Sequence, residues 1–342
     1  MRFDMKKIFS ILIAFFFLLT VVGCTSKADS TDPNNKKFKI AYISDTYGEE
    51  DVKNKEIING VNESFKNYDF SFDIKVPKSS ENYETVANGL LSSTKYDLVL
   101  ANSPAVCSSL LAVHSDYPTS NLGFIGYGDE TNNSMSITFK NEEGAFLSGY
   151  LAAKSTKTDV LGYIGAYENK NQDYEYGFMS GAKAANKNVK VEKAFTNSYI
   201  DAQAGSKIAE ELVSKKADVF FTVCGAGAIG VDNVIREKGL KVIDSDLYNK
   251  SDNEIKLGEI YKNYKNAAMS ICDSVIFESF NKNVNNLGVG DSVVNLKLNP
   301  NFYKEGDSVT LELEECKKDI ATGALKVPKD NKSFETFKYK TK

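Results

Sequence analysis

The chain has 342 residues, of which 42 are lysine or arginine, 46 are aspartate or glutamate and one is histidine, His114. The formal net charge of −4, with no clustered basic stretch, argues against binding to nucleic acid. A single histidine and the absence of any close cysteine pair argue against a zinc site, and we predict no cofactor.

The first 23 residues have the order of a bacterial export signal. Basic residues at the start are followed by the apolar run 8–22 and then by Gly23-Cys24. The run is shorter than the roughly 20 apolar residues that a spanning helix needs, and a small residue before a cysteine resembles the site where bacterial lipoproteins are cleaved and acylated. We therefore expect Cys24 to carry a lipid, with an uncleaved anchor as the alternative. Residues 24–37 would then be a flexible tether on the outer face of the cell membrane.

Removal of the signal leaves 319 residues, 39 of them basic and 45 acidic, which is more than one hydrophobic core usually serves. Apolar runs alternate with amphipathic stretches, as in βαβ units with a mostly parallel sheet. The predicted strands are 38–44, 70–76, 96–102, 121–127, 159–167, 189–195, 218–223 and 241–246. The polar segment 128–133 interrupts the alternation after the fourth strand. We predict two similar α/β lobes with a ligand cleft at the carboxyl ends of their strands.

Four further cysteines are scattered along the chain, at Cys107, Cys224, Cys272 and Cys316. We interpret them as buried free thiols, and a structural disulfide is the alternative.

Six segments, in this order, resemble the basic membrane protein family of ABC-transporter substrate-binding lipoproteins, whose characterised members include purine nucleoside receptors. They are 136–153 (SITFKNEEGAFLSGYLAA), 174–184 (YEYGFMSGAKA), 217–230 (ADVFFTVCGAGAIG), 243–246 (IDSD), 286–290 (NLGVG) and 320–328 (IATGALKVP). The resemblance covers nearly the whole mature chain.

The resemblance implies a fold similar to type I periplasmic binding proteins, in which the chain crosses three times between the lobes. It places the first lobe at 38–134 and 249–288, the second at 135–248 and 289–325, and a tail at 326–342. It also implies a monomer without catalytic activity that binds a small polar metabolite, such as a nucleoside, and delivers it to a membrane permease.

In the first lobe, Asp45 ends a predicted strand and begins a polar turn that contains Tyr47. The corresponding family loop is led by aspartate and ends in Ser-Phe-Asn, whose phenylalanine stacks on the nucleobase. Residues 52–54 occupy those three positions, so Asn54 is retained whereas Lys53 replaces the aromatic residue. Tyr47 offers a substitute stacking face. Gly126 stands where the family has an aspartate.

Asn102 and Ser103 follow the third predicted strand, where they would either contact the ligand or cap the next helix. In the second lobe, Tyr199 and Asp201 resemble a family motif with a stacking aromatic residue and a nearby acid. Helix capping by Asp201 is the alternative.

Asp244 and Asp246 flank Ser245 at the end of a strand, where carboxylates are well placed to bind sugar hydroxyls. The resemblance implies a ribose contact in this motif, and we favour Asp244, with a solvated acid at the hinge as the alternative. Lys262 falls where the family has a lysine near its ligand, and a solvated helix lysine is the alternative.

Gly225 begins a segment, 225–230, that matches the dinucleotide-binding pattern G-x-G-x-x-G after a strand. An exported protein does not normally meet NAD, so we interpret Gly225 as a close backbone contact for another ligand. The sequence has no Ser-His-Asp, Cys-His or metal-binding constellation. A binding protein of an importer is therefore favoured over a surface sensor and over an NAD-dependent oxidoreductase.

Overall fold

The computed structural model describes residues 36–129, 131, 133–247 and 250–339. The predicted signal, Cys24 and most of the predicted tether lie outside the described residues. Residues from Lys37 onward form one compact unit. Among the helices that are described, none is both long enough and apolar enough to cross a membrane.

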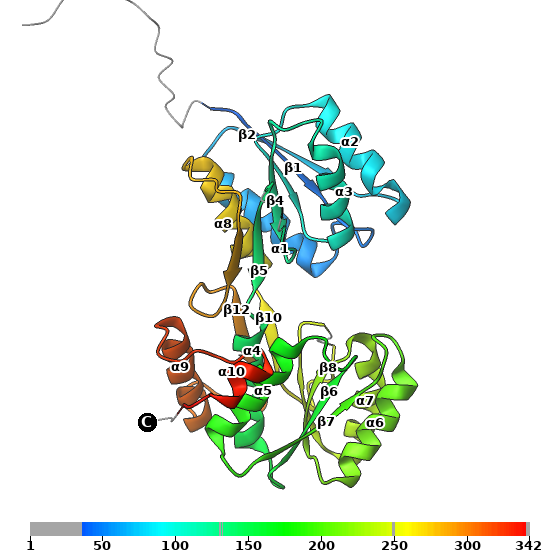
Figure 1. The fold of residues 1–342 in the computed structure, drawn as a ribbon, viewed down its shortest axis with the longest axis vertical. Helices are drawn as coiled ribbons and strands as arrows, with labels where there is room; N and C mark the ends of the chain where they lie inside the picture. The colour runs from blue at the N-terminus through cyan, green and yellow to red at the C-terminus, as the bar shows by residue number, and fades with distance from the viewer. Residues whose placement is uncertain (1–35, 130, 132, 248–249, 340–342) are drawn as a thin grey trace, which may run out of the picture. The chain divides into compact units, whose positions relative to one another are not determined.

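The first lobe is built on a six-stranded parallel sheet in the order β11-β5-β4-β3-β1-β2 (Figure 1). Its strands are β1 (Phe38–Ile43), β2 (Phe70–Lys75), β3 (Leu98–Ala101), β4 (Asn121–Ile125), β5 (Ser134–Phe139) and β11 (Val284–Leu287). Helices α1 (Val52–Phe65) and α8 (Tyr264–Ile276) pack on one face of the sheet. The 3-10 turn η2 (Ser80–Asn82), α2 (Tyr83–Ser93) and α3 (Pro104–His114) lie on the side of the other face.

The second lobe has a sheet in the order β12-β10-β9-β8-β6-β7, parallel except for the antiparallel pair β10–β12. Its strands are β6 (Val160–Gly165), β7 (Lys190–Phe195), β8 (Val219–Val223), β9 (Lys241–Asp244), β10 (Lys256–Lys262) and β12 (Val294–Leu298). One face carries α4 (Asn141–Ser155), α5 (Gln172–Ala185), α9 (Ser308–Ala321) and α10 (Asn331–Glu335). The other carries α6 (Ala202–Ser214), the 3-10 turn η3 (Gly225–Gly227) and α7 (Ala228–Lys238).

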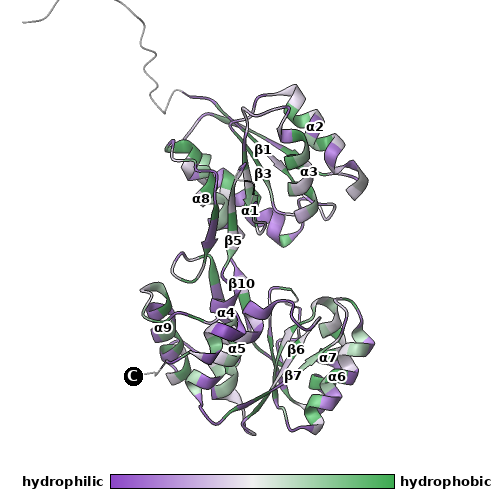
Figure 2. Ribbon diagram, viewed as in Figure 1, coloured by the Kyte–Doolittle hydropathy of each residue, from purple (hydrophilic) through white to green (hydrophobic). Residues whose placement is uncertain are grey.

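The central strands are apolar along both faces because helices cover both. In β1, Ile40 and Tyr42 point to the core beneath α1 and α8, whereas Ala41 and Ile43 point to the core beneath α2 and α3. Successive side chains of a strand face opposite sides, so a doubly covered strand has a continuous apolar sequence. Figure 2 shows the resulting concentration of hydrophobic residues in the strands.

All eight predicted strands are present, with ends that differ from the prediction by at most a few residues. The prediction missed β5, β10, β11 and β12. The predicted class, two α/β lobes with mostly parallel sheets, is confirmed.

The expected lobe boundaries place each of two strands, β5 and β10, in one lobe, whereas strand pairing places it in the sheet of the other lobe. β5 belongs to the first sheet although the expected second lobe begins at residue 135, and β10 belongs to the second sheet although the expected return begins at 249. The chain therefore crosses between the sheets directly after β5, β10 and β11. Each crossing lies at the end of a strand, so a small error in its position moves a whole strand to the other lobe.

Candidate functional site

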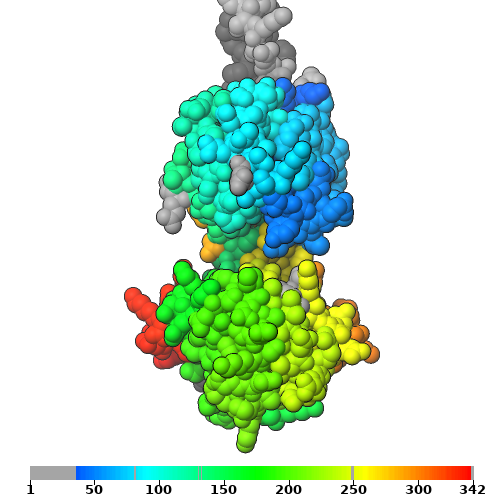
Figure 3. All heavy atoms as spheres, turned by 90° about the vertical axis from the view of Figure 1, so that its right-hand side faces the viewer, coloured from blue at the N-terminus to red at the C-terminus, as the bar shows by residue number. Residues whose placement is uncertain are grey.

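A cavity of about 760 Å³ lies between the two lobes. Its wall comes from the start of α1, the loop after β9, the end of β10 and the starts of α7 and α8. Figure 3 shows the face on which the blue residues of the first lobe lie opposite the green and yellow residues of the second across a narrowed waist. The lining residues are Tyr47, Asp51, Val52, Lys53, Glu56, Ala226, Ile229, Asp246, Leu247, Lys250, Glu259, Ile260, Tyr261, Lys262, Tyr264 and Lys297. The structure thus brings Tyr47, Asp246 and Lys262 together from the predicted set.

The polar centre of the wall is an ion pair between Asp246 and Lys262. Lys262 Nζ lies 2.7 Å from Asp246 Oδ2, and the two side chains are only 9% and 10% exposed. The hydroxyl of Tyr174 donates a hydrogen bond to Asp246, and Lys262 Nζ lies 3.2 Å from that hydroxyl. Burial alone would raise the pKa of Asp246, but Lys262 and Tyr174 outweigh burial and hold the pKa below its usual range. The wall of the cavity therefore contains a carboxylate that is ionised at neutral pH, together with its cationic partner.

Asp244, two residues earlier, does not line the cavity. It is fully buried, and its carboxylate accepts hydrogen bonds from the hydroxyl of Ser251 at 2.6 Å and from the Ser251 backbone N–H at 3.2 Å. Burial raises the pKa of Asp244 to about 7. Asp244 ties Ser251 to the end of β9, and the geometry favours Asp246 over Asp244 for ligand contact.

Asp45, Asn54 and Asn102 belong to a hydrogen-bonded network behind the cavity. The Tyr42 hydroxyl lies 2.7 Å from Asn54 Oδ1 and 3.0 Å from Asn102 Oδ1. Asn54 Nδ2 donates to Asp45 Oδ1 at 3.1 Å and to the carbonyl of Gly48 at 2.7 Å. The buried Asn54 thereby fixes the turn that carries Tyr47, which is itself 78% exposed. None of these three predicted residues lines the cavity.

The remaining predicted residues occupy helix starts and loops outside the cavity wall. Asp201 is the N-cap of α6 and accepts from two backbone N–H groups, at 2.9 and 3.0 Å, so the capping alternative is observed. Ser103 stands at the N-cap of α3 without a capping hydrogen bond from its side chain. The hydroxyl of Tyr199 accepts from Asn171 Nδ2 at 3.0 Å, and its ring packs edge-on against Tyr167.

The glycine motif at 225–230 is explained by helix packing. Gly230 lies so close to α6 that a Cβ atom there would stand 1.7 Å from the carbonyl oxygen of Ala202. Gly225 has a φ of +57°, and a Cβ atom would stand 2.7 Å from the carbonyl oxygen of Tyr199. These glycines let α6 and α7 meet at backbone distance, which requires no dinucleotide.

The four cysteines that follow Cys24 are all buried and free, which confirms the favoured interpretation. In the described part of the chain, no group of three or more histidine, cysteine or acidic residues is arranged to hold a metal ion.

Sequence reasoning missed the contacts that link the cavity to the crossing between the lobes. Glu56 on α1 accepts a hydrogen bond from the Tyr261 hydroxyl at 2.9 Å and from the Tyr264 backbone N–H at 3.0 Å. Lys53 lies 5.7 Å from the ring centre of Tyr264, and Lys297 lies 3.5 Å from that of Tyr261. Glu56 and Tyr261 are 205 residues apart in sequence, so no local pattern indicates their pairing.

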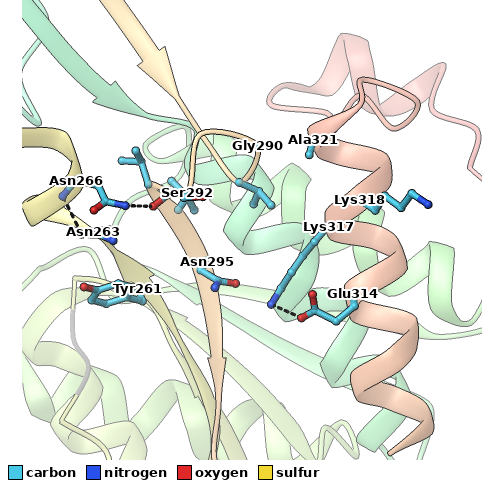
Figure 4. Close-up of a pocket in the computed structure, with 13 residues that line it drawn as sticks. Tyr261, Asn263, Asn266, Gly290, Ser292, Asn295, Glu314, Lys317, Lys318 and Ala321 are labelled. Carbon is cyan, nitrogen blue, oxygen red and sulfur yellow. Dashed lines mark hydrogen bonds and ion pairs between the residues drawn. The ribbon is translucent and has the colours of Figure 1, made fainter. Parts of the chain in front are cut away.

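A second cavity, of about 520 Å³, lies between β12 and α9 (Figure 4). Its polar side chains have partners within the protein: Lys317 pairs with Glu314 at 2.8 Å, and Asn266 Nδ2 donates to the backbone carbonyl of Ser292 at 3.2 Å. None of the predicted site residues lines it. The cavity between the lobes is therefore the candidate site.

The sequence of the chain is similar to those of known proteins. Residues 37–330 match the family described as ABC transporter substrate-binding protein PnrA-like. The chain is 28% identical to basic membrane protein B of Borreliella burgdorferi, over 67% of this chain and 69% of that protein. It is 30% identical to basic membrane protein A of the same species, over 60% and 62%. It is 28% identical to a CD4+ T-cell-stimulating antigen of Listeria innocua, over 65% of each chain. The alignments thus span about two thirds of these relatives.

Solved structures with the same arrangement of elements include an ABC transporter solute-binding protein from Aeropyrum pernix, with a TM-score of 0.62 and 20% identity over 87% of this chain and 96% of that one. A transcriptional activator of the comK gene from Bacillus halodurans has a TM-score of 0.70 and 17% identity, over 85% and 99%. At such low identity these likenesses establish the fold alone, which is that of periplasmic binding proteins, as the sequence predicts.

Proposed function

Because the chain belongs to the PnrA-like family of ABC transporter substrate-binding proteins, we propose that it captures a nucleoside or a related polar metabolite in the cavity between its lobes. The family binds substrates for transport, so the chain is a binding protein and not an enzyme. The observation that carries the proposal is the Asp246–Lys262 ion pair in the wall of a cavity lined by both lobes.

The size and lining of the cavity support this ligand class. A volume of about 760 Å³ lies within the range of roughly 300–1,000 Å³ that is usual for small-molecule sites. Asp246 already accepts two hydrogen bonds, but a carboxylate has about four acceptor positions and retains capacity for ligand hydroxyls. Tyr47 and Val52 present exposed apolar surface from the first lobe, as Ile229 and Leu247 do from the second. A planar ring with attached hydroxyls matches such a lining.

Ligand contacts from both lobes favour a closed form. A ligand that binds the closed form better shifts the equilibrium toward it, by a rotation at the crossings between the lobes. The closed monomer then docks on a membrane permease and releases its cargo.

We extend the proposal to the membrane, where a lipid on Cys24 holds the protein at the extracytoplasmic face. If so, a Cys24→Ser chain leaves the membrane fraction and fails to incorporate labelled palmitate.

Thermal unfolding of residues 37–342 with nucleosides, nucleobases, riboflavin and simple sugars tests the binding proposal. A ligand present at 100 times its Kd should stabilise the folded protein by about 2.7 kcal/mol. Asp246→Asn should weaken this effect, whereas substitution of Asp201, which caps α6 outside the cavity, should leave the ligand-induced shift intact. Absence of any shift with every class of polar metabolite refutes the proposal.

A further inference from the structure

We propose that the end of α5 and the segment after α10 form a basic surface that binds the anionic phospholipid headgroups of a membrane. We call this surface the basic face. It consists of the exposed Lys183, Lys187 and Lys338 around the half-buried rings of Phe337 and Tyr339. Helix α10, which precedes the last described residues, lies beside α5 on the second lobe (Figure 1). The proposal is independent of the ligand that the cavity between the lobes captures.

The charge of the chain is unevenly distributed. Residues 326–342 contain six lysines and two acids, a net charge of +4, whereas the whole chain has a net charge of −4. No two of these lysines are adjacent, so the sequence shows no basic run. Most of this segment also lies beyond residue 330, where the match to the family ends. A basic segment in an otherwise acidic chain is typical of a contact with an anionic partner.

Aromatic rings hold this segment against the second lobe. Phe337 and Tyr339 pack edge-on against Phe146 of α4, with ring centres 6.2 and 6.0 Å apart. The Tyr339 hydroxyl donates a hydrogen bond to Asp319 of α9 at 3.0 Å. Lys338, between the two packed rings, is exposed. The packing therefore fixes where this lysine is presented.

The lysines of the basic face lie around a cavity that contains no acid. This cavity, of about 520 Å³, is lined by the three lysines and by Ala184, Ala185, Phe337 and Tyr339. None of the three lysines forms an ion pair with any residue that the structure describes. Lys183 lies 5.6 Å from the ring centre of Phe334. The cations of this wall are therefore unmatched, and the fold gathers them from two segments more than 140 residues apart.

The two acids of segment 326–342 have other partners. Asp330 caps α10, where it accepts hydrogen bonds from the backbone N–H of Ser333 at 2.8 Å and from its hydroxyl at 2.7 Å. Glu335 accepts a hydrogen bond from Asn331 Nδ2 at 2.8 Å. Neither lines the cavity. The positive charge of the basic face is thus available to an anion from outside the chain.

A membrane surface matches both components of this face. Phosphate groups of anionic lipids attract lysines, and aromatic rings favour the boundary between headgroups and acyl chains. The rings and the two alanines offer apolar surface to the glycerol region, which a free phosphate would not use. A substrate-binding protein of an ABC transporter works beside a membrane. Because the rest of the chain is acidic, an anionic membrane attracts this face and repels the others.

Sedimentation with vesicles tests the proposal on residues 37–342, which form one compact unit and lack Cys24. The vesicles contain phosphatidylcholine alone or with about a third phosphatidylglycerol. We expect binding to the anionic vesicles only, and we expect it to weaken with added salt. The triple variant Lys183→Gln, Lys187→Gln, Lys338→Gln should bind roughly 100-fold more weakly, about fivefold for each lysine.

A second triple variant removes the same charge from exposed positions outside the basic face. Its substitutions are Lys78→Gln, Lys95→Gln and Lys207→Gln. This control should retain most of the binding to anionic vesicles. All six lysines are exposed, so circular dichroism and thermal unfolding should show both variants folded.

Three results overturn the basic face as a lipid-binding surface. They are equal sedimentation with neutral and anionic vesicles, an equal loss of binding in the two triple variants, and calorimetric binding of soluble glycerol 3-phosphate without binding to vesicles. Thermal shifts with polar metabolites, measured on the same variants, should match those of the wild type. Loss of lipid binding would therefore leave ligand capture standing, and absence of every thermal shift would leave the basic face standing.

Discussion

Replacement of Asp246 by asparagine is the sharpest test of the ion pair in the cavity wall. The change preserves the size of the side chain but leaves the ammonium of Lys262, 9% exposed, without its counter-charge. Removing one partner of a buried pair costs roughly 3–5 kcal/mol, because the other charge stays buried. The pair borders a cavity, so we expect the low end, about 3 kcal/mol. This corresponds to a fall in Tm of roughly 6–12 °C at about 2–4 °C per kcal/mol.

A double-mutant cycle separates the pair from its surroundings. Lys262→Met keeps an apolar chain near the ring of Phe139, which lies 5.0 Å from the ammonium. The variant with both substitutions buries no charge, and neutral replacements of buried pairs are often no less stable than the pair itself. We therefore expect the double variant to be more stable than Asp246→Asn alone, as measured by urea and thermal unfolding. Tyr174→Phe, which removes one hydrogen bond to Asp246, should cost about 1 kcal/mol.

The pH dependence has a definite sign. The folded pKa of Asp246 lies below its unfolded value of about 4, so its contribution is complete above pH 4 and is lost as pH falls through the folded pKa. Asp246→Asn should therefore lose less stability on acidification than the wild type. Two results would refute the buried pair by showing that water solvates Lys262. One is a decrease in Tm of less than about 2 °C for Asp246→Asn, and the other is a double variant that is less stable than Asp246→Asn.

Three further predictions address other parts of the molecule. Burial raises the pKa of Asp244 and of Glu142 to about 7, so the native protein retains protons between pH 4 and 7 that the unfolded chain releases. The free energy of unfolding should therefore fall as the pH rises from 4 to 7. Asp244→Asn should make this dependence on pH less steep. An unchanged slope in that variant would contradict the assignment. Gly230→Ala should destabilise the protein by about 3 kcal/mol or more, whereas Gly89→Ala on α2, where a Cβ atom meets nothing within 4 Å, should stabilise it by about 0.5–1 kcal/mol; similar chemical denaturation curves for the two would disprove the packing role. Tyr47→Ala should leave the Tm of the free protein unchanged, since the side chain is 78% exposed, but should weaken an aromatic ligand about three- to tenfold in calorimetry; undiminished affinity excludes Tyr47 as a stacking surface.

The strands that sequence reasoning found are those with a strong local signal. β1, β3, β4 and β8 are buried on both faces or nearly so, and their continuous apolar sequence reports that burial directly. β11 has the sequence VNNL and is half exposed, so it is defined mainly by its pairing with β5, 148 residues earlier at the Asn286–Thr138 position. Such pairing has no counterpart in the local pattern.

The site shows the same division. That acids at the end of β9 stand near a cleft follows from the geometry of parallel sheets, and Asp246 fulfils it. The sequence does not show which of the two acids faces the cavity. β9 ends at Asp244, so the direction of the Asp246 side chain is set by the turn that follows and not by the alternation of side chains along the strand. The capping role of Asp201 was equally visible in the sequence, whereas the contact of Glu56 with Tyr261 required the three-dimensional structure.

Helix α1 connects the cavity between the lobes to the crossings of the chain from one lobe to the other. Lys53 and Glu56 are three residues apart and thus neighbours on its surface; Lys53 lines the cavity, and Glu56 binds Tyr264, where the chain enters α8. A Cβ atom at Gly60 would stand 2.6 Å from the carbonyl oxygen of Lys265, so the backbones of α1 and α8 are in close contact. We therefore expect a ligand that draws the start of α1 toward the second lobe to move both helices together.

The crossings are themselves bonded to one another, which limits how that motion is absorbed. The backbone N–H of Asn263 donates to the carbonyl of Val293 at 2.8 Å, and that of Lys140 donates to Leu287 at 2.8 Å. The segment after β10 is thus joined to the one before β12, and the segment after β5 is joined to the end of β11. With the connections bonded in pairs, a rotation at one bends its partner as well. We therefore expect closure of the lobes to be a concerted hinge motion rather than the opening of a single flexible link.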